Sequence, residues 1–277
     1  MTVEIDNTLD GVDWAEAKAD LAADEAKERA PVKGTFRGYA IISMAPPSSG
    51  GVALIEMLNM LESFDLKAKG FASPEAKHFE IEAMRRAYLD RARYLGDPDV
   101  VQIPRAKLLS KDYARTLAST IDPAKASSSA ELGKDILTKA ATQEPDETTH
   151  FSVIDREGMA VSNTVTLEGG YGSHVVVKGA GFLLNNERGD FNKQPGVTLA
   201  DGTIGTPANL IDPGKRMLSS MTPTIVSRGG KVVLITGSPG GRTIINTVFC
   251  VALAVTEFGM NVRAAVDAPR MHNQWMP

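Results

Sequence analysis

The change from helical to strand-like sequence falls in the stretch Asp146-Glu147-Thr148-Thr149-His150-Phe151-Ser152-Val153-Ile154-Asp155. From His150 onward polar and apolar residues alternate, which is typical of a β-strand with two different faces. A turn follows at Arg156-Glu157-Gly158, and the alternation resumes from Met159 to Leu167. The stretch is therefore predicted to open a β-hairpin, with two adjacent threonines at its start.

Helical periodicity dominates the chain before this hairpin. Ser73-Pro74 supplies a helix cap and a first-turn proline. The segments predicted to be helical are 13–30, 50–64, 74–95 and 105–120. From Asp122 to Glu147 the sequence is polar and turn-rich, which predicts an exposed linker that would tolerate cleavage.

Strands are expected after the hairpin. The predicted strands are 173–177, 181–184, 223–227 and 231–236. The turn Gly237-Ser238-Pro239-Gly240-Gly241 then begins a helix that extends to about Phe258. Helices, then a run of strands, then a helix again predict an α+β fold, with a layered αββα sandwich as its specific form.

The composition is that of an ordinary globular protein, with 277 residues, 43% of them hydrophobic and 23% charged. The net charge of −4 favours neither nucleic acid nor an anionic membrane surface as a partner. The longest apolar run, 248–255, is too short to span a bilayer, and the acidic N-terminus lacks the features of a signal peptide. The four histidines show no metal-ligand spacing.

Thr148 and Thr149 are candidates for chemistry. A threonine freed as a new N-terminus has a nucleophilic hydroxyl and, in its own α-amine, a built-in base. On position alone, the simpler interpretation is a strand start with exposed hydroxyls. The surrounding sequence favours a catalytic role instead, because hairpin pairing would bring Thr166 close to the start of the first strand. The glycine turn 237–241 also offers N–H groups for a carboxylate or an oxyanion.

Short motifs are spread along the chain: Met44-Ala45-Pro46-Pro47-Ser48-Ser49-Gly50-Gly51, Tyr94-Leu95-Gly96-Asp97-Pro98, Thr148-Thr149-His150-Phe151-Ser152-Val153, Leu183-Leu184-Asn185-Asn186, Leu218-Ser219-Ser220-Met221, Gly237-Ser238-Pro239-Gly240-Gly241 and Asp267-Ala268-Pro269-Arg270. In this order they resemble the motifs of the γ-glutamyltranspeptidases. The resemblance covers roughly Lys33 to the C-terminus. It implies the four-layer αββα sandwich of the N-terminal-nucleophile hydrolases.

For catalysis, the resemblance implies that Thr148 is the nucleophile, freed by autocatalytic cleavage of the Glu147–Thr148 bond. Thr166 would then hold the new N-terminus by a hydrogen bond. The N–H groups of Gly240 and Gly241 would form the oxyanion hole. The region 1–147 would correspond to the end of a large subunit and 148–277 to a small subunit. After cleavage the two halves would stay associated as a heterodimer, in what is expected to be one structural domain.

For binding, the resemblance assigns Glu168, Glu187 and Asp190 to the ammonium of a γ-glutamyl group. It assigns Ser219 and Ser220 to the α-carboxylate of the same group. The implied reaction is acyl transfer from glutathione or a similar γ-glutamyl amide to the threonine, and then to water or an amino acid. No metal or organic cofactor is implied. Family members work mostly outside the cytoplasm, which implies a periplasmic or extracellular location.

The chain also departs from the family pattern. The segment Pro195 to Asn209 resembles the lid over the site, but Asp201 stands near the position where some members carry an aromatic residue. Family members have a long N-terminal portion before the region matching Gly38, and it supplies an arginine that pairs with the substrate carboxylate. They also continue beyond the residue matching Pro277. The expectation is therefore a chain truncated at both ends.

Two alternatives stay open at this point. One is a truncated chain that keeps the core of the fold and turns nothing over. The other is a cephalosporin- or glutaryl-type acylase, which shares the fold and the nucleophile, although Glu168 and Asp190 argue against an acyl group without an amine. Nucleotide binding at 237–241 is disfavoured because the turn lacks the P-loop lysine and the G-x-G-x-x-G spacing. A serine hydrolase is disfavoured because the sequence has no G-x-S-x-G motif.

Overall fold

The structure is a computed structural model that describes residues 14–136, 138–139, 147–192, 198–199 and 206–276. Its largest sheet has four antiparallel strands in the order β1-β2-β7-β8. Their bounds are β1 Val32–Phe36, β2 Tyr39–Ser43, β7 Thr224–Arg228 and β8 Lys231–Thr236. The sheet therefore joins strands that lie about 180 residues apart in the sequence.

Two tight turns connect these strands in pairs. Arg37 and Gly38 link β1 to β2 with φ angles of 50° and 81°, and Gly229 and Gly230 link β7 to β8 with 57° and 78°. Positive φ at both central residues is the signature of a two-residue hairpin turn whose twist matches that of its strands. The β7–β8 hairpin expected at 223–236 is present, and β1 and β2 form a second hairpin in the N-terminal part of the chain.

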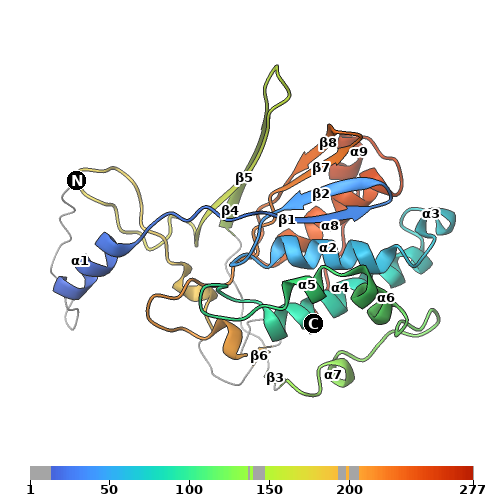
Figure 1. Ribbon diagram of the computed structural model, residues 1–277, viewed down its shortest axis with the longest axis horizontal. Helices are drawn as coiled ribbons and strands as arrows, with labels where there is room; N and C mark the ends of the chain where they lie inside the picture. The colour runs from blue at the N-terminus through green and yellow to red at the C-terminus, as the bar shows by residue number, and fades with distance from the viewer. Residues whose placement is uncertain (1–13, 137, 140–146, 193–197, 200–205, 277) are drawn as a thin grey trace.

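Helices cover one face of this sheet (Figure 1). The helix α2, Gly50–Leu61, is buried along its whole length. It packs against β1 and β2 together with α8, Thr243–Thr256, which contacts β8. On its other side α2 meets α4, Pro74–Tyr94, and α6, Lys111–Ala118. Each fully buried leucine of α2 stabilises this core by about 2 kcal/mol.

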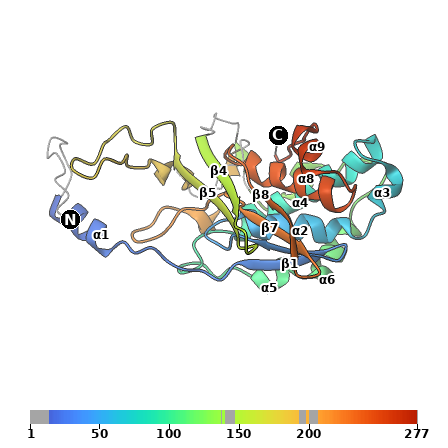
Figure 2. The ribbon, with the colours of Figure 1, turned by 90° about the horizontal axis from the view of Figure 1, so that it is seen from above.

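The remaining elements are short. They are α1 Trp14–Ala23, α3 Leu66–Lys69, α5 Arg105–Leu108, α7 Ser129–Leu132, α9 Val262–Asp267, the 3₁₀ turns η1 Glu187–Asp190 and η2 Pro207–Asn209, and the parallel pair β3 Thr138–Lys139 and β6 Thr198–Leu199. The helix α1 lies away from the sheet, at one end of the molecule (Figures 1 and 2). No helix in the described part of the chain is long and apolar enough to cross a membrane.

The predicted central hairpin is present as β4, Glu147–Ile154, and β5, Ala160–Glu168. Figure 2 shows it beside β8, and one residue in its middle joins it to the sheet. Ser162 Oγ donates to the carbonyl of Thr236 at 3.0 Å and accepts from the N–H of Thr224 at 3.0 Å. The hairpin is thereby held at the end of β8 and the start of β7, with its own first residues near the turn that opens α8.

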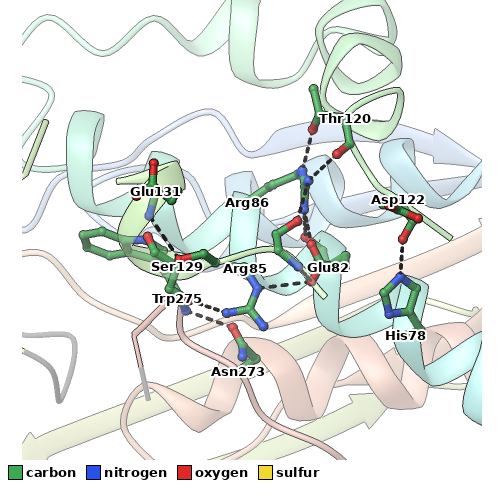
Figure 3. A network of polar contacts seen from close by, with 12 residues as sticks. His78, Glu82, Arg85, Arg86, Thr120, Asp122, Ser129, Glu131, Asn273 and Trp275 are labelled. Atoms are coloured by element: carbon green, nitrogen blue, oxygen red, sulfur yellow. Dashed lines mark hydrogen bonds and ion pairs between the residues drawn. The ribbon is translucent and has the colours of Figure 1, made fainter. Parts of the chain in front are cut away.

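A polar network on α4 anchors the segment after α6 (Figure 3). The buried guanidinium of Arg86 forms an ion pair with Glu82 and donates to the hydroxyl and carbonyl of Thr120. Trp275, near the C-terminus, is buried, and its indole N–H donates to the carbonyl of Ser129 at 2.9 Å. The segment expected to be a linker is thus attached to the helical layer at its start, and residues 140–146 lie outside the described part of the chain.

The prediction of strands at 173–177 and 181–184 was wrong. The two segments contact each other through an isolated bridge between Val176 and Leu183 and through backbone hydrogen bonds, with a tight turn between them, but they form no regular strand. Gly179 and Gly181 have positive φ, and the side chain of Val176 is exposed. Alternation alone predicted strands here, but no neighbouring strand within the described chain supplies a ladder for them.

Candidate active site

One pocket of about 450 Å³, including its part open to solvent, lies where the start of the central hairpin meets the turn before α8. Its lining combines hydroxyls, carboxylates and an arginine: Glu147, Thr148, Thr166, Glu168, Asp190, Ser219, Ser220, Met221, Gly241, Arg242 and Ile244. Every site residue predicted from the sequence lines this pocket except Gly240, which is adjacent to Gly241, and Glu187. Segments up to about 100 residues apart in sequence thus converge on one cavity.

The Glu147–Thr148 peptide bond lies at an irregularity of the hairpin. Glu147 pairs with Glu168 and Thr149 pairs with Val165, so two residues of β5 lie opposite Thr148 alone. Such a bulge redirects the backbone locally and is common beside active sites. Thr148 is half-buried and lines the pocket, whereas Thr149 is exposed.

Thr166 reaches across the hairpin to the carbonyl of this bond. Its Oγ1 donates to the oxygen of Glu147 at 2.8 Å and accepts from the N–H of Glu168 at 2.9 Å. A hydroxyl donating to a carbonyl oxygen withdraws electron density from the carbonyl carbon, which favours attack by a nucleophile there. The Thr148 hydroxyl belongs to the residue directly after that carbonyl. The sequence thus places a nucleophile and an electrophile on adjacent residues of one chain.

Three carboxylates, those of Glu168, Glu187 and Asp190, form an acidic group at this same end of β5. Glu168 has a positive φ of 72°, and Gly189 lies so close to its carboxylate that a Cβ there would collide with it. The backbone N–H of Glu187 donates to the side-chain carbonyl of Asn185 at 3.0 Å, at the start of η1. Burial raises the pKa of Glu187 to about 7, and the charges of Asp190 and Glu168 add to the shift. A cation bound here would relieve this repulsion.

Glu187→Gln is expected to stabilise the protein at alkaline pH. The pKa of Glu187 is about 7 in the folded state against 4.5 for an ordinary glutamate, so folding stability is lost as the pH rises between these values. Glutamine has no proton to lose, and the free energy of unfolding of the variant should exceed that of the parent by about 1–3 kcal/mol near pH 8. Denaturant unfolding near pH 4 and near pH 8 measures this, and an equal difference at both would contradict the raised pKa.

The two serines line the pocket from one short segment, the serine turn, residues 218–221. The carbonyl of Ser219 accepts from the N–H of Ser49 at 2.8 Å and from its Oγ at 2.7 Å. Ser220 Oγ accepts from Nη2 of Arg91 at 3.0 Å. Gly50 lies against Thr222 so closely that a Cβ would collide with it. The glycine-rich turn that opens α2 therefore supports the serine turn from behind, and its Ser49 N–H serves packing instead of binding an anion.

The turn that opens α8 presents its glycines beside the hairpin. Gly240 has φ 119° and Gly241 φ 52°, and the carbonyl of Gly240 accepts from the N–H and the hydroxyl of Thr243 at 2.9 and 2.6 Å. Gly237 lies against the imidazole of His150, where a Cβ would collide with the ring. His150 is held by a 2.8 Å hydrogen bond between Nδ1 and Thr164 Oγ1, and burial lowers its pKa. The imidazole of His150 thus spaces the turn from the hairpin.

Sequence reasoning missed Arg91, Asn209 and His150 as residues that shape this site. Asn209 is buried; its Nδ2 donates to the carbonyl of Asp190 at 2.7 Å and its Oδ1 accepts from the N–H of Leu218 at 3.0 Å. It therefore ties the acidic residues to the serine turn. Arg91 could have been noticed in the sequence, because it stands at helical spacing from Met84 and Tyr88 in the predicted helix 74–95. Most of the expected lid, Pro195 to Asn209, lies outside the described residues, as does Asp201.

Comparisons with known proteins agree with the motifs. The model of the γ-glutamyltranspeptidase family matches residues 15–277. The glutathione hydrolase proenzyme of Escherichia coli strain K12 is 47% identical over 260 residues, and that of Bacillus subtilis strain 168 is 38% identical over 268. The acylase ACY 1 proenzyme of Pseudomonas sp. strain SE83 is 35% identical over 254 residues. These matches cover 92–94% of this chain but only 42–44% of the relatives, so the chain spans less than half of their length.

A solved structure supports the same grouping at the level of the fold. The crystal structure of cephalosporin acylase from Bacillus halodurans superposes with a TM-score of 0.72 at 26% identity, over 91% of this chain and 42% of that one. The α+β fold of the N-terminal-nucleophile hydrolases, expected from the sequence, is confirmed. With the family model matched over nearly the whole chain, the protein belongs to the γ-glutamyltranspeptidase family.

Proposed function

We propose that this chain is the self-processing core of a γ-glutamyl acyltransferase and hydrolase that acts on glutathione and related γ-glutamyl amides. One observation carries the proposal. The Glu147–Thr148 bond borders a pocket that is also lined by carboxylates and by a pair of serines, and its carbonyl accepts from Thr166. A pocket with both kinds of group matches an amino acid head group, which bears an ammonium and a carboxylate.

Self-processing begins with the hydroxyl of Thr148. Its oxygen attacks the carbonyl carbon of Glu147, the C–N bond breaks, and the acyl group moves from nitrogen to oxygen as an ester. Water then hydrolyses the ester, which leaves Glu147 with a carboxylate and Thr148 with a free amine. The hydroxyl of Thr166, which donates a hydrogen bond to the Glu147 oxygen at 2.8 Å, stabilises the negative charge that this oxygen gains. The regions 1–147 and 148–277 stay together as a heterodimer, because the core packs residues from both.

Turnover uses the same hydroxyl on a substrate. The new amine of Thr148 takes the hydroxyl proton, the oxygen attacks the γ-carbonyl of the donor, and the donor amine leaves with a proton. The N–H groups of Gly240 and Gly241 stabilise the oxyanion, each by about 3 kcal/mol. Water or the amine of an amino acid then attacks the threonyl ester and regenerates the enzyme. No cofactor takes part in this scheme.

Recognition of the donor rests on two kinds of polar group at the pocket, carboxylates and serine hydroxyls. Glu168, Glu187 and Asp190 bind the ammonium, and Ser219 and Ser220 donate to the α-carboxylate. The bacterial relatives are glutathione hydrolase proenzymes, which supports the same activity for this chain. A periplasmic or extracellular location is proposed on the same resemblance.

The second candidate is an acylase for acyl groups without an amine, favoured by the acylase relatives and by the cephalosporin acylase structure. Hydrolysis of γ-glutamyl-anilide and glutaryl-anilide by the purified protein separates the two. The acidic group should favour the γ-glutamyl donor by about 100-fold or more in kcat/KM, because glutaryl lacks the ammonium. Preference for the glutaryl donor would establish the acylase, and turnover of neither would contradict both candidates.

A further inference from the structure

The guanidinium of Arg91 lies directly behind the serine turn. It comes from α4, far in the sequence from the pocket, and only 4% of the residue is exposed. Its Nε donates to Ser49 Oγ at 2.9 Å and its Nη2 to Ser220 Oγ at 3.0 Å. Ser49 Oγ in turn donates to the carbonyl of Ser219 at 2.7 Å. Arg91 thus holds Ser220 by a direct hydrogen bond and Ser219 through the hydroxyl of Ser49.

The charge of Arg91 is also unusual for its degree of burial. Within the described chain no carboxylate lies at ion-pair distance from Arg91, which contacts hydroxyls and the ring of Tyr88, whose centroid is 5.9 Å away. Burial lowers the pKa of Arg91, and the charge of Asp190, beyond ion-pair distance, only partly opposes this. Arg86, equally buried on the same helix, forms an ion pair with Glu82. A buried cation costs free energy unless it is paired, so an anion bound beside Ser220 would be strongly favoured.

The direction of the hydrogen bond to Ser220 adds a second effect. Arg91 only donates, so Ser220 Oγ accepts from it and keeps its own hydrogen for another acceptor. Ser220 lines the pocket, which places that hydrogen where a ligand oxygen would lie. The guanidinium therefore orients the hydroxyl as a donor and increases its acidity, since accepting from a cation polarises the O–H bond.

We propose that Arg91 is a positioning residue for the α-carboxylate of the donor: it fixes Ser220 as a hydrogen-bond donor into the pocket and supplies a buried positive charge that the carboxylate neutralises. The inference rests on the proposed function, because it names a residue that the same carboxylate would require. Arg91 acts through Ser220 and Ser49, and it need not touch the substrate itself.

The test compares two donors that differ only in the carboxylate. γ-Glutamyl-anilide carries it, and 4-aminobutyryl-anilide keeps the ammonium but lacks it. In Arg91→Met the ratio of kcat/KM for the first donor over the second is expected to fall by on the order of 10- to 100-fold, mainly through a higher KM for the γ-glutamyl donor. Arg91→Lys should recover part of the ratio, because it restores the charge without the fork that reaches both serines.

Arg86→Met is the matched control, since it removes an equally buried arginine of α4 that lies away from the pocket. It should lower thermal stability without changing the donor ratio. Self-cleavage at Glu147–Thr148 involves no substrate carboxylate and should persist in Arg91→Met, which reports an intact fold. If Arg91→Met does not fold, the ratio in Arg91→Lys decides by the same criterion.

An unchanged ratio in Arg91→Met, whether both donors lose equally or neither loses, would overturn the role of Arg91 while leaving the proposed function in place. A parent protein that cleaves itself but hydrolyses neither donor would contradict the proposed function, and the role of Arg91 with it. The two failures are therefore distinguished by the parent protein alone.

Discussion

Thr148→Ala is expected to remain a single chain of 29.6 kDa after any length of incubation, with acyl-transfer activity reduced to background. The substitution removes the hydroxyl of the residue that directly follows the Glu147 carbonyl and lines the pocket. Without it neither the acyl shift nor the attack on a donor has a nucleophile, and the fall in kcat should be on the order of 10⁴-fold or more. Intact mass and the release of anilide from γ-glutamyl-anilide measure the two effects.

The neighbouring threonine supplies the control. Thr149 is exposed and pairs with Val165 in the ladder, so Thr149→Ala should cleave and turn over like the parent. Thr148→Ser keeps the hydroxyl and, after cleavage, the amine, and it should retain both reactions at a reduced rate. Cleavage between residues 147 and 148 in Thr148→Ala would rule out the hydroxyl as the attacking group.

Asp190→Asn should lower kcat/KM for γ-glutamyl-anilide by about 100- to 1,000-fold, chiefly through KM. Asp190 lines the pocket and lies close enough to Glu187 to raise its pKa. The substitution removes one of the charges that would surround the donor ammonium, and breaking a desolvated charge pair costs about 3–5 kcal/mol. Steady-state kinetics on the self-cleaved protein provide the measurement.

A donor without the amine separates binding from damage to the fold. Glutaryl-anilide should lose far less than γ-glutamyl-anilide in Asp190→Asn, because its acyl group brings no ammonium to the acidic group. Asp212→Asn, an exposed position in the segment after η2, should leave both donors unaffected. Losses of the same size on both donors would show that Asp190 supports the structure of the site and does not select the ammonium.

Much of the local structure could be predicted because its causes are local. The hairpins β4–β5 and β7–β8 follow from alternation on either side of a turn, and Gly229-Gly230 adopts the positive φ that such a turn requires. Ser73 caps α4 by accepting from the N–H of Ala76, with Pro74 in the first turn, as expected. The same reasoning failed at 173–184, where alternation has no neighbouring strand to pair with.

The candidate site also has features that the sequence could predict and features that it could not. Thr148 and the serine pair could be named in advance because each stands in a short motif of the chain, and Thr166 because hairpin pairing brings it to the start of the first strand. The carboxylates, the hydroxyls and the glycine turn were thus available from the sequence as separate pieces. Their arrangement around one pocket could not be predicted, since no single segment contains more than a few of them.

By itself, the sequence determined the family, the α+β class, the bond that is proposed to break and most of the side chains around it, because motifs and periodicity are written within short segments. Only the tertiary structure decided that Thr166 holds the Glu147 carbonyl, that burial and two neighbouring carboxylates raise the pKa of Glu187, and that Arg91 stands behind Ser220. Arg91 and Ser220 are 129 positions apart. Their contact exists only because the core packs α4 beside the serine turn, and that packing depends on the whole chain.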